Sequence, residues 1–104
     1  IRGNALFIYN LFQKKVMAQS YLIMFTGREC THCHEMDPLV DQLEKELGVN
    51  VDRLEVWHDE KNAKLLAGYD KGFCGGVPFF FNTKTGKWIC GAVNIDVLKK
   101  WATG

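Results

Sequence analysis

A short apolar run leads directly into two closely spaced cysteines, and this arrangement constrains the chain more than any other feature of its sequence. Residues 21–25 are continuously apolar, which is typical of a strand buried on both faces of a sheet. After a loop over residues 26–29, the segment 30–47 has the pattern of an amphipathic helix that ends at Gly48. Its apolar positions form one stripe: Leu39, Val40, Leu43 and Leu47. This order predicts a buried strand that delivers Cys30 to the beginning of a helix.

The rest of the chain continues as alternating helices and strands. Strand–helix–strand connections are right-handed, so the strands over 21–25 and 53–57 should run parallel, and a hairpin adds an antiparallel edge. We therefore expect an α/β fold in which helices flank a mixed four-stranded sheet. The aromatic residues are assigned to the core and the sheet faces: Trp57, Phe79, Phe80, Phe81, Trp88 and Trp101. The further expected elements are a helix over 5–18, a helix over 60–69 capped by Asp59, strands over 77–81 and 87–90 joined by a turn over 82–86, and a closing helix after Asn94.

Size and composition exclude several classes of protein. The 104 residues suit a single domain over 1–104, and 47% apolar with 24% charged residues is ordinary for a soluble globular protein. A net charge of +1 with interspersed acids and bases lacks the basic stripe that nucleic-acid binding requires. No apolar run approaches the ~18 residues of a membrane span. Because the chain opens at Ile1 rather than methionine, we expect it to be a piece of a longer precursor.

The pair Cys30 and Cys33 has the spacing that brings two sulfurs within bridging range at the start of a helix. At that place, unpaired backbone N–H groups and the helix dipole favour the thiolate and lower the pKa of the first cysteine. His32 and Arg28 add positive charge nearby. We therefore expect Cys30 to be the attacking thiolate and Cys33, one turn further in and more buried, to resolve the mixed disulfide.

The positions of the two prolines carry a family resemblance. Pro38 lies five residues beyond Cys33 within the same helix, and Gly76-Val77-Pro78 opens the hairpin strand. From about residue 21 to residue 101 the chain resembles thioredoxins and their relatives. The resemblance implies a thioredoxin fold and a thiol–disulfide oxidoreductase. Its partners would be the disulfides or dithiols of other proteins, plus a reductant or oxidant that resets the pair, with no metal or organic cofactor.

The resemblance also assigns roles to residues around the dithiol. It implies a cis peptide bond before Pro78, which packs against the dithiol and blocks metal binding. Val77 would pair through its backbone with a substrate peptide, and Gly91 would form part of the substrate rim. Thr31 and Gly76 complete the expected substrate-binding set, and Pro38 is expected to be structural, bending its helix. Over its whole length the chain resembles thioredoxin-like proteins of photosynthetic eukaryotes, for which a plastid or cytoplasmic location would fit.

The motif departs from that of thioredoxins, which carry Trp-Cys-Gly-Pro-Cys. Here Glu29 precedes the first cysteine, and Thr31 and His32 fill the motif. A histidine just before the second cysteine resembles the oxidising branch of the fold, in which it stabilises the reduced thiolate. We therefore expect His32 to tune the reduction potential.

Two further departures concern the surroundings of the dithiol. Met24 replaces the buried aspartate that helps thioredoxins deprotonate the second cysteine, which leaves His34, Glu29 or Glu55 as alternative proton acceptors. The first strand of the family is expected to be missing, because residues 1–4 are too few to form it.

Other readings of the motif stay open. Cys30 to His34 also matches the attachment signature of c-type haem, and Cys30, Cys33 and His34 or His58 could hold zinc. A purely structural dithiol and a non-catalytic binding or redox-sensing module are further alternatives. A glutathione-linked, glutaredoxin-like activity is another: Gly76 departs from the Thr-Val-Pro of glutaredoxins, whereas Gly91-Ala92 matches their Gly-Gly in part.

The two remaining cysteines, Cys74 and Cys90, both lie near the expected substrate rim. One hypothesis is a second, regulatory redox pair. The interpretation we favour from sequence alone is that both are small buried apolar residues on neighbouring strands.

Overall fold

The computed structural model describes residues 20–104. The helix expected over 5–18 and the expected absence of the first family strand lie outside the described residues. The described elements are β2 (Leu22–Thr26), α2 (Thr31–Leu47), β3 (Val51–Glu55), α3 (Glu60–Asp70), β4 (Phe79–Asn82), β5 (Trp88–Cys90) and α4 (Ile95–Thr103). None of the helices in this part of the chain is long and apolar enough to cross a membrane.

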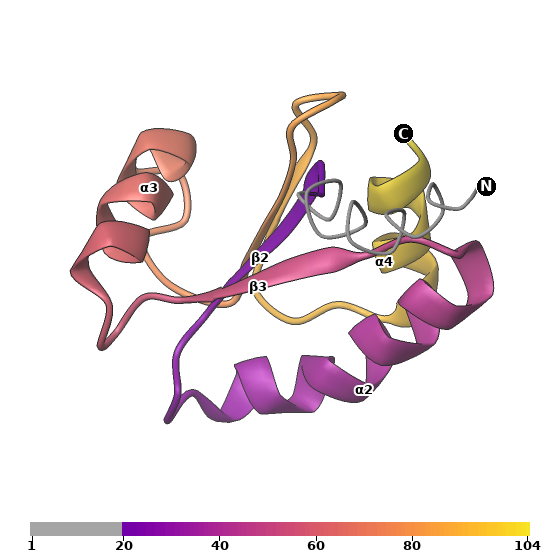
Figure 1. The fold of residues 1–104 in the computed structure, drawn as a ribbon, viewed down its shortest axis with the longest axis horizontal. Helices are drawn as coiled ribbons and strands as arrows, with labels where there is room; N and C mark the ends of the chain where they lie inside the picture. Colours follow the sequence, from indigo (N-terminus) through magenta and orange to yellow (C-terminus); the bar gives the residue numbers. More distant parts are fainter. Residues whose placement is uncertain (1–19) are drawn as a thin grey trace, which may run out of the picture.

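The strands form one mixed sheet in the order β3-β2-β4-β5. β2 and β3 run parallel, whereas β4 is antiparallel to both β2 and β5. This confirms the predicted α/β fold with a parallel crossover and an antiparallel hairpin. Figure 1 shows α3 apart from α2 and α4, with the strands β2 and β3 running between them.

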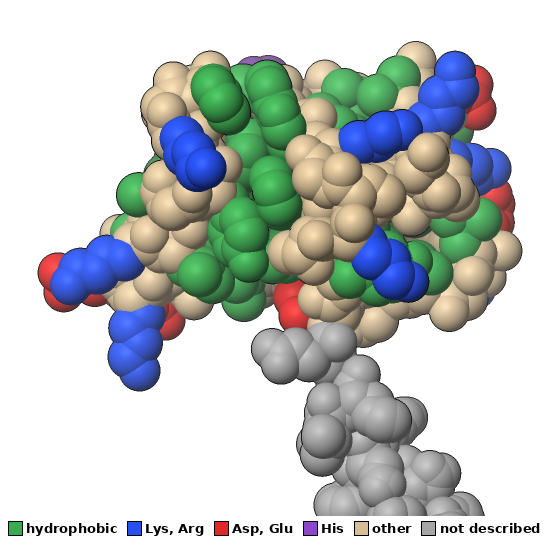
Figure 2. Space-filling view, turned by 90° about the horizontal axis from the view of Figure 1, so that it is seen from above, with side chains coloured by type: hydrophobic (Ala, Val, Ile, Leu, Met, Phe, Trp, Pro, Cys, Tyr) green, Lys and Arg blue, Asp and Glu red, His purple; other side chains and the backbone are tan. Residues whose placement is uncertain are grey.

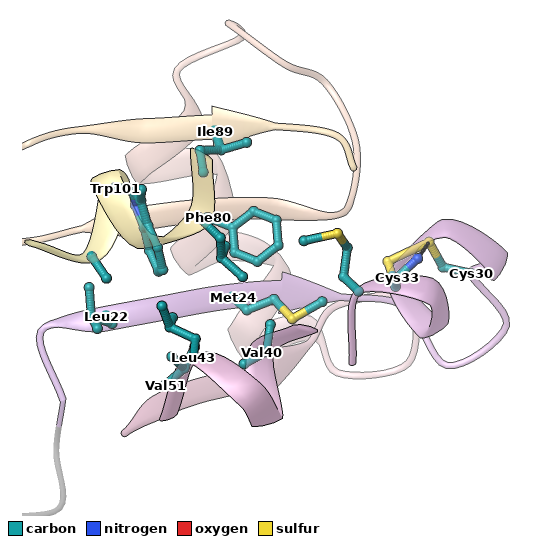
Figure 3. Packing of buried hydrophobic residues seen from close by; sticks show 13 residues of the cluster. Leu22, Met24, Cys30, Cys33, Val40, Leu43, Val51, Phe80, Ile89 and Trp101 are labelled. Atoms are coloured by element: carbon teal, nitrogen blue, oxygen red, sulfur yellow. Dashed lines mark hydrogen bonds between the residues drawn. A yellow bond between two sulfur atoms is a disulfide. The ribbon is translucent and has the colours of Figure 1, made fainter. Parts of the chain in front are cut away.

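Alternate residues of β2 supply the two faces of the sheet. Leu22 and Met24 pack into a cluster with residues of α2 and α4, whereas Ile23 and Phe25 belong to a second cluster that α3 covers. All four side chains are buried, as a strand in the middle of a helix-covered sheet requires. The first cluster is drawn in Figure 3, where Met24 points toward the dithiol end of α2.

Helix α2 positions the dithiol, and local signals set both of its ends. It starts after Cys30, which is extended (φ −84°, ψ 110°), and ends at Gly48, whose φ of 67° favours glycine. Its buried face consists of Cys33, Met36, Val40 and Leu43. Pro38 lies within the helix on its exposed side, so the N–H that proline lacks is lost where water can satisfy the freed carbonyl.

Several sequence expectations were wrong. β3 spans Val51–Glu55 rather than residues 53–57, because it pairs residue for residue with β2 from Leu22 onward. β4 begins at Phe79 rather than at residue 77, so Val77 and Pro78 precede the strand. Trp57 and Trp88 are not core residues: they are 52% and 44% exposed. Trp57 falls beyond the end of β3, and Trp88 lies on the edge strand, where no further strand covers it.

Candidate active site

Cys30 and Cys33 form a disulfide at the first turn of α2, with their Cα atoms 5.2 Å apart. The sulfur of Cys30 also accepts a hydrogen bond of 3.2 Å from the backbone N–H of Cys33, so it occupies the place of a helix-capping oxygen. Cys33 is fully buried and Cys30 is 7% exposed. The predicted order of burial is confirmed, although Cys30 is itself nearly enclosed.

The cover over Cys30 comes from the loop before β4. The carbonyl oxygen of Val77 lies 3.9 Å from the Cys30 sulfur, and the following bond, Val77–Pro78, is cis. Pro78 is fully buried, and its carbonyl accepts a 2.9 Å hydrogen bond from the N–H of Gly91. The structure thus brings Val77 beside the dithiol and Gly91 against Pro78, with Gly76 next to Val77 in the chain.

The loop that leads into the dithiol is fastened to the turn after β3. A Cβ atom added to Gly27 would lie 2.5 Å from the ring of Trp57, so the indole packs directly on the backbone there. The carboxylate of Glu55 accepts hydrogen bonds from the N–H groups of Arg28 (2.9 Å), Trp57 (3.2 Å) and His58 (2.8 Å). Burial alone would raise the pKa of Glu55, but these N–H donors outweigh it and lower that pKa.

Glu29 and His58 fasten the same loop from its exposed side. The Nε2 atom of His58 lies 2.8 Å from a carboxylate oxygen of Glu29, and this hydrogen bond lowers the pKa of Glu29. The sequence analysis named His58 only as an alternative zinc ligand and missed this contact. The two residues are 29 positions apart, so only the parallel pairing of β2 and β3 brings them together.

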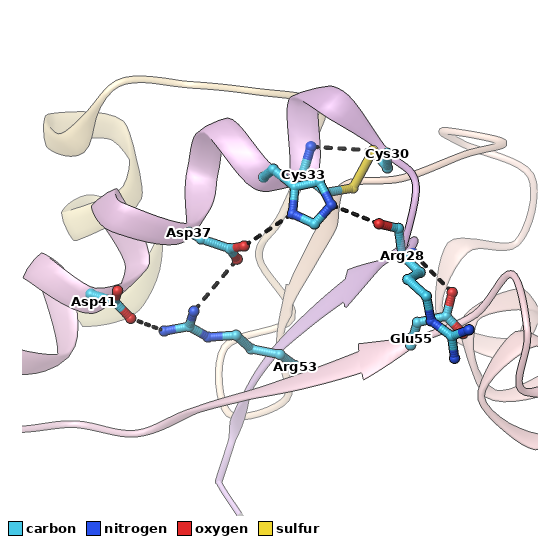
Figure 4. Close-up of polar contacts among 8 residues, drawn as sticks. Arg28, Cys30, Cys33, Asp37, Asp41, Arg53 and Glu55 are labelled. Atoms are coloured by element: carbon cyan, nitrogen blue, oxygen red, sulfur yellow. Dashed lines mark hydrogen bonds and ion pairs between the residues drawn. A yellow bond between two sulfur atoms is a disulfide. The ribbon is translucent and has the colours of Figure 1, made fainter.

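His34, on the first turn of α2, contacts the same loop. Figure 4 shows the positions of its partners Arg28 and Asp37. Its Nε2 atom is 2.6 Å from the carbonyl oxygen of Arg28, and its Nδ1 atom is 3.5 Å from Asp37. The Arg28 carbonyl first, and Asp37 second, raise the pKa of His34 above its ordinary value. Asp37 in turn contacts Arg53 of β3 at 3.5 Å, and the same guanidinium holds Asp41 at 2.6 Å. These contacts tie the start of α2 to the sheet.

His32 and Thr31 are exposed on the first turn of α2. The His32 side chain is 72% exposed, and its Nδ1 atom lies 3.0 Å from Glu35. His32 is therefore beside the dithiol along the chain but turned toward solvent, where an incoming molecule can reach it.

No acid replaces the aspartate that thioredoxins carry at the Met24 position, as far as the described part of the chain shows. Met24 is fully buried in the cluster that contains Cys33. Between residues 20 and 104, the buried polar side chains are Asp70 and Asn82, which bond to Cys74 N–H and to the Trp101 carbonyl.

The side chains named from the sequence as alternative proton acceptors all have other hydrogen-bond partners. His34 bonds to the Arg28 carbonyl, Glu29 to His58, and Glu55 to backbone N–H groups. The core side of the dithiol is therefore apolar.

Cys74 and Cys90 also form a disulfide, with Cα atoms 5.5 Å apart. The interpretation of both as buried residues on neighbouring strands is wrong: Cys74 lies in the loop after α3, and Cys90 is exposed at the end of β5. The buried Asp70, which sequence reasoning missed, shapes this loop by accepting the N–H groups of Cys74 and Gly75. The available signal was an acidic residue just before a glycine-containing turn.

A known protein family matches this chain. The family model described as Thioredoxin matches residues 6–103. The chain belongs to the thioredoxin family. A comparison with curated protein sequences gives no match.

Solved structures of the thioredoxin family share the fold. Glutaredoxin 1 from Archaeoglobus fulgidus has a TM-score of 0.59 at 18% identity, over 86% of this chain and 94% of that one. Mitochondrial thioredoxin 3 from Saccharomyces cerevisiae, in its oxidised form, has a TM-score of 0.57 at 19% identity, over 90% and 88%. A wheat glutaredoxin has a TM-score of 0.56 at 19% identity, over 96% and 88%. The thioredoxin-like fold and its Cys-x-x-Cys pair support a redox function.

The metal-binding alternatives need cysteine sulfurs that are not bonded to each other, and in this structure Cys30 and Cys33 form a disulfide. Across residues 20–104, no three His, Cys, Asp or Glu side chains are grouped so as to hold a metal ion.

Proposed function

We propose that this chain is a thiol–disulfide oxidoreductase that acts on the cysteines of other proteins through Cys30 and Cys33. The observation that carries the proposal is the position of the Cys30 sulfur. It caps α2, where the helix dipole favours a thiolate, and it faces the Val77 carbonyl across 3.9 Å.

In the reducing direction, the reaction has two exchange steps. The Cys30 thiolate attacks a sulfur of the substrate disulfide, a mixed disulfide forms, and the first substrate thiolate leaves. The Cys33 sulfur then attacks Cys30, which releases the second substrate thiolate and closes the Cys30–Cys33 disulfide. Two electrons pass to the substrate, and the two protons released by the cysteines reach its sulfurs through water. The oxidising direction is the reverse.

The substrate would lie along Val77, whose backbone borders the dithiol. Thr31, Gly76 and Gly91 would form the rim around it, and Pro78 would keep the Val77 carbonyl in place. His32, exposed on the same turn, would favour the reduced thiolate and so raise the reduction potential. We therefore propose that the reduction potential of its Cys30–Cys33 pair is higher than that of thioredoxin.

A redox titration with trapping tests this function. The protein is equilibrated in dithiothreitol buffers, alkylated and analysed by mass spectrometry. We expect a reversible two-electron couple for Cys30–Cys33 between about −270 and −120 mV. The test substrate is a protein whose disulfides have been reduced and then re-formed. The Cys33→Ser variant should accumulate a mixed disulfide between Cys30 and this substrate, whereas the Cys30→Ser variant should trap none.

A pair that never opens, or a Cys33→Ser variant that traps no partner, contradicts the proposal. A glutathione mixed disulfide is the test substrate for the glutaredoxin-like alternative, because the solved structures that share the fold include a glutaredoxin and a thioredoxin. Faster reaction with a glutathione mixed disulfide than with a protein disulfide would favour the glutaredoxin alternative.

A further inference from the structure

The second disulfide, Cys74–Cys90, is placed where another thiol can reach it. It joins the loop after α3 to the end of β5, and Cys90 is exposed while Cys74 is half-buried. Exposed disulfides are the labile members of their class. We propose that Cys74–Cys90 is a second thiol–disulfide exchange site, reduced by a dithiol, and that its state controls the segment 75–78 beside Cys30.

The two cysteines stay close when the bond opens, because other contacts hold their segments. The Asp70 carboxylate, 5% exposed, accepts the N–H of Cys74 at 2.6 Å and that of Gly75 at 2.8 Å. On the other side, Cys90 is the register partner of Phe79 in the β4–β5 ladder. Opening is therefore a local event, and the thiols remain placed to close again.

An aromatic stack bridges the same two segments. Phe73, next to Cys74, lies against Trp88 of β5 with ring centroids 5.3 Å apart and planes 12° from parallel. Both rings border a surface groove whose other walls include Tyr69 and Phe81. Figure 2 shows hydrophobic side chains gathered in a band across this side of the molecule. The stack supports the loop independently of the sulfur–sulfur bond.

The segment between the two disulfides connects their states. Residues 75–78 start directly after Cys74 and end at Pro78, whose carbonyl accepts the N–H of Gly91, the residue after Cys90. Within this segment, the Val77 carbonyl faces the Cys30 sulfur at 3.9 Å. A closed second disulfide fixes the start of the segment, and an open one leaves it held only by the non-covalent contacts of Asp70 and of the Phe73–Trp88 stack. This part of the inference rests on the proposed function of Cys30.

The exchange balances with a dithiol as the co-reactant. One thiolate of the dithiol attacks the sulfur of Cys90, the more exposed residue, and the Cys74 thiolate leaves and takes a proton from water. The second thiolate of the dithiol then attacks the dithiol's first sulfur, which is bonded to Cys90 in the mixed disulfide, and the Cys90 thiolate leaves. The dithiol is oxidised to a disulfide by two electrons, and Cys74 and Cys90 are reduced.

The first test removes the other dithiol. A Cys30→Ser, Cys33→Ser double variant is titrated with reduced and oxidised dithiothreitol, alkylated and analysed by mass spectrometry, while circular dichroism follows the fold. We expect Cys74–Cys90 to open and to close again with the fold intact. A bond that opens only when the protein unfolds, or that does not re-form, overturns the exchange site. This result does not depend on any activity of Cys30.

The second test measures the coupling. The rate at which Cys30 reacts with dithiobis(nitrobenzoate) is compared between Cys33→Ser and the triple variant Cys33→Ser, Cys74→Ser, Cys90→Ser. We expect the rate constants to differ by about threefold or more, with free cysteine as the reagent control. Equal rates overturn the control of Cys30. A Cys30 that reacts in neither variant overturns the proposed function instead, and the first test still decides the exchange site.

Discussion

The Nε2 atom of His34 lies 2.6 Å from the carbonyl oxygen of Arg28, across the loop that leads into the dithiol. This contact and Asp37 raise the pKa of His34. A group whose pKa is higher in the folded state stabilises the fold fully below its ordinary pKa, about 6.5 for histidine, and this stabilisation is lost as pH rises through the folded pKa.

We therefore expect His34→Gln to lower the melting temperature more at pH 5 than at pH 9. A nuclear magnetic resonance titration of the oxidised protein should place the His34 pKa above about 6.5, and Asp37→Asn should bring it down because the negative charge beside the ring is lost. A His34 ring that titrates at the same pH in both proteins would contradict this account.

Replacing His32 should shift the reduction potential without disturbing the fold, since its side chain is 72% exposed. We expect His32→Gln to favour the Cys30–Cys33 disulfide by about tenfold in equilibrium constant, which for this couple lowers the potential by about 30 mV. Titration in dithiothreitol buffers measures the shift. Glu35→Gln, which removes only the negative charge of the ring's partner, is the matched control and should change the potential less.

Introducing an acid at Met24 tests whether the core side of the dithiol is apolar. A carboxyl at this fully buried position has a raised pKa, so Met24→Asp should lose stability as pH rises above about 3.9, the ordinary value for aspartate. Urea unfolding at pH 4 and pH 7 should show a larger loss at pH 7. Met24→Leu, of similar volume, should cost less than about 1.5 kcal/mol at either pH.

Asn82 is a buried polar anchor for the β4–β5 turn. Its amide donates to the Trp101 carbonyl at 2.9 Å, and its side-chain oxygen accepts the N–H groups of Lys84 and Thr85. We expect Asn82→Ala to cost about 1–3 kcal/mol for each buried group left without a partner. Asn94→Ala, which removes only the exposed cap of α4, should cost about 1 kcal/mol in the same urea experiment.

Removing the second disulfide should weaken the protein without unfolding it. The bond closes a loop with a sequence separation of 16, for which chain entropy predicts about 3 kcal/mol. Urea unfolding of Cys74→Ser, Cys90→Ser should show a loss of this size. Its circular dichroism spectrum should match that of the wild type, because Asp70 and the Phe73–Trp88 stack still hold the loop.

The sequence predicted the elements that depend on local patterns. The apolar run of β2, the stripe of α2 and the caps Asp59 and Asn94 are each encoded within a few residues, and the structure contains all of them. The positions of the two prolines indicated the family, because few folds have a proline both within the helix that follows the dithiol and directly before the hairpin strand.

The features that escaped prediction depend on distant pairing. The start of β3 follows from its register with β2, and the contact of Glu29 with His58 follows from the same pairing. The bond between Cys74 and Cys90 requires the loop after α3 to fold back on the edge strand, which the buried Asp70 directs. Neither cysteine has a local signal for its partner.

The indole of Trp57 lies so close to the backbone of Gly27 that the two positions are not free to change separately. A side chain at position 27 requires a smaller residue at position 57, and a retained tryptophan requires glycine. In related chains we therefore expect these positions to vary as a pair. The path of the loop into the dithiol therefore depends on two residues that are 30 positions apart in the sequence. Neither of them contacts a substrate in the proposed reaction.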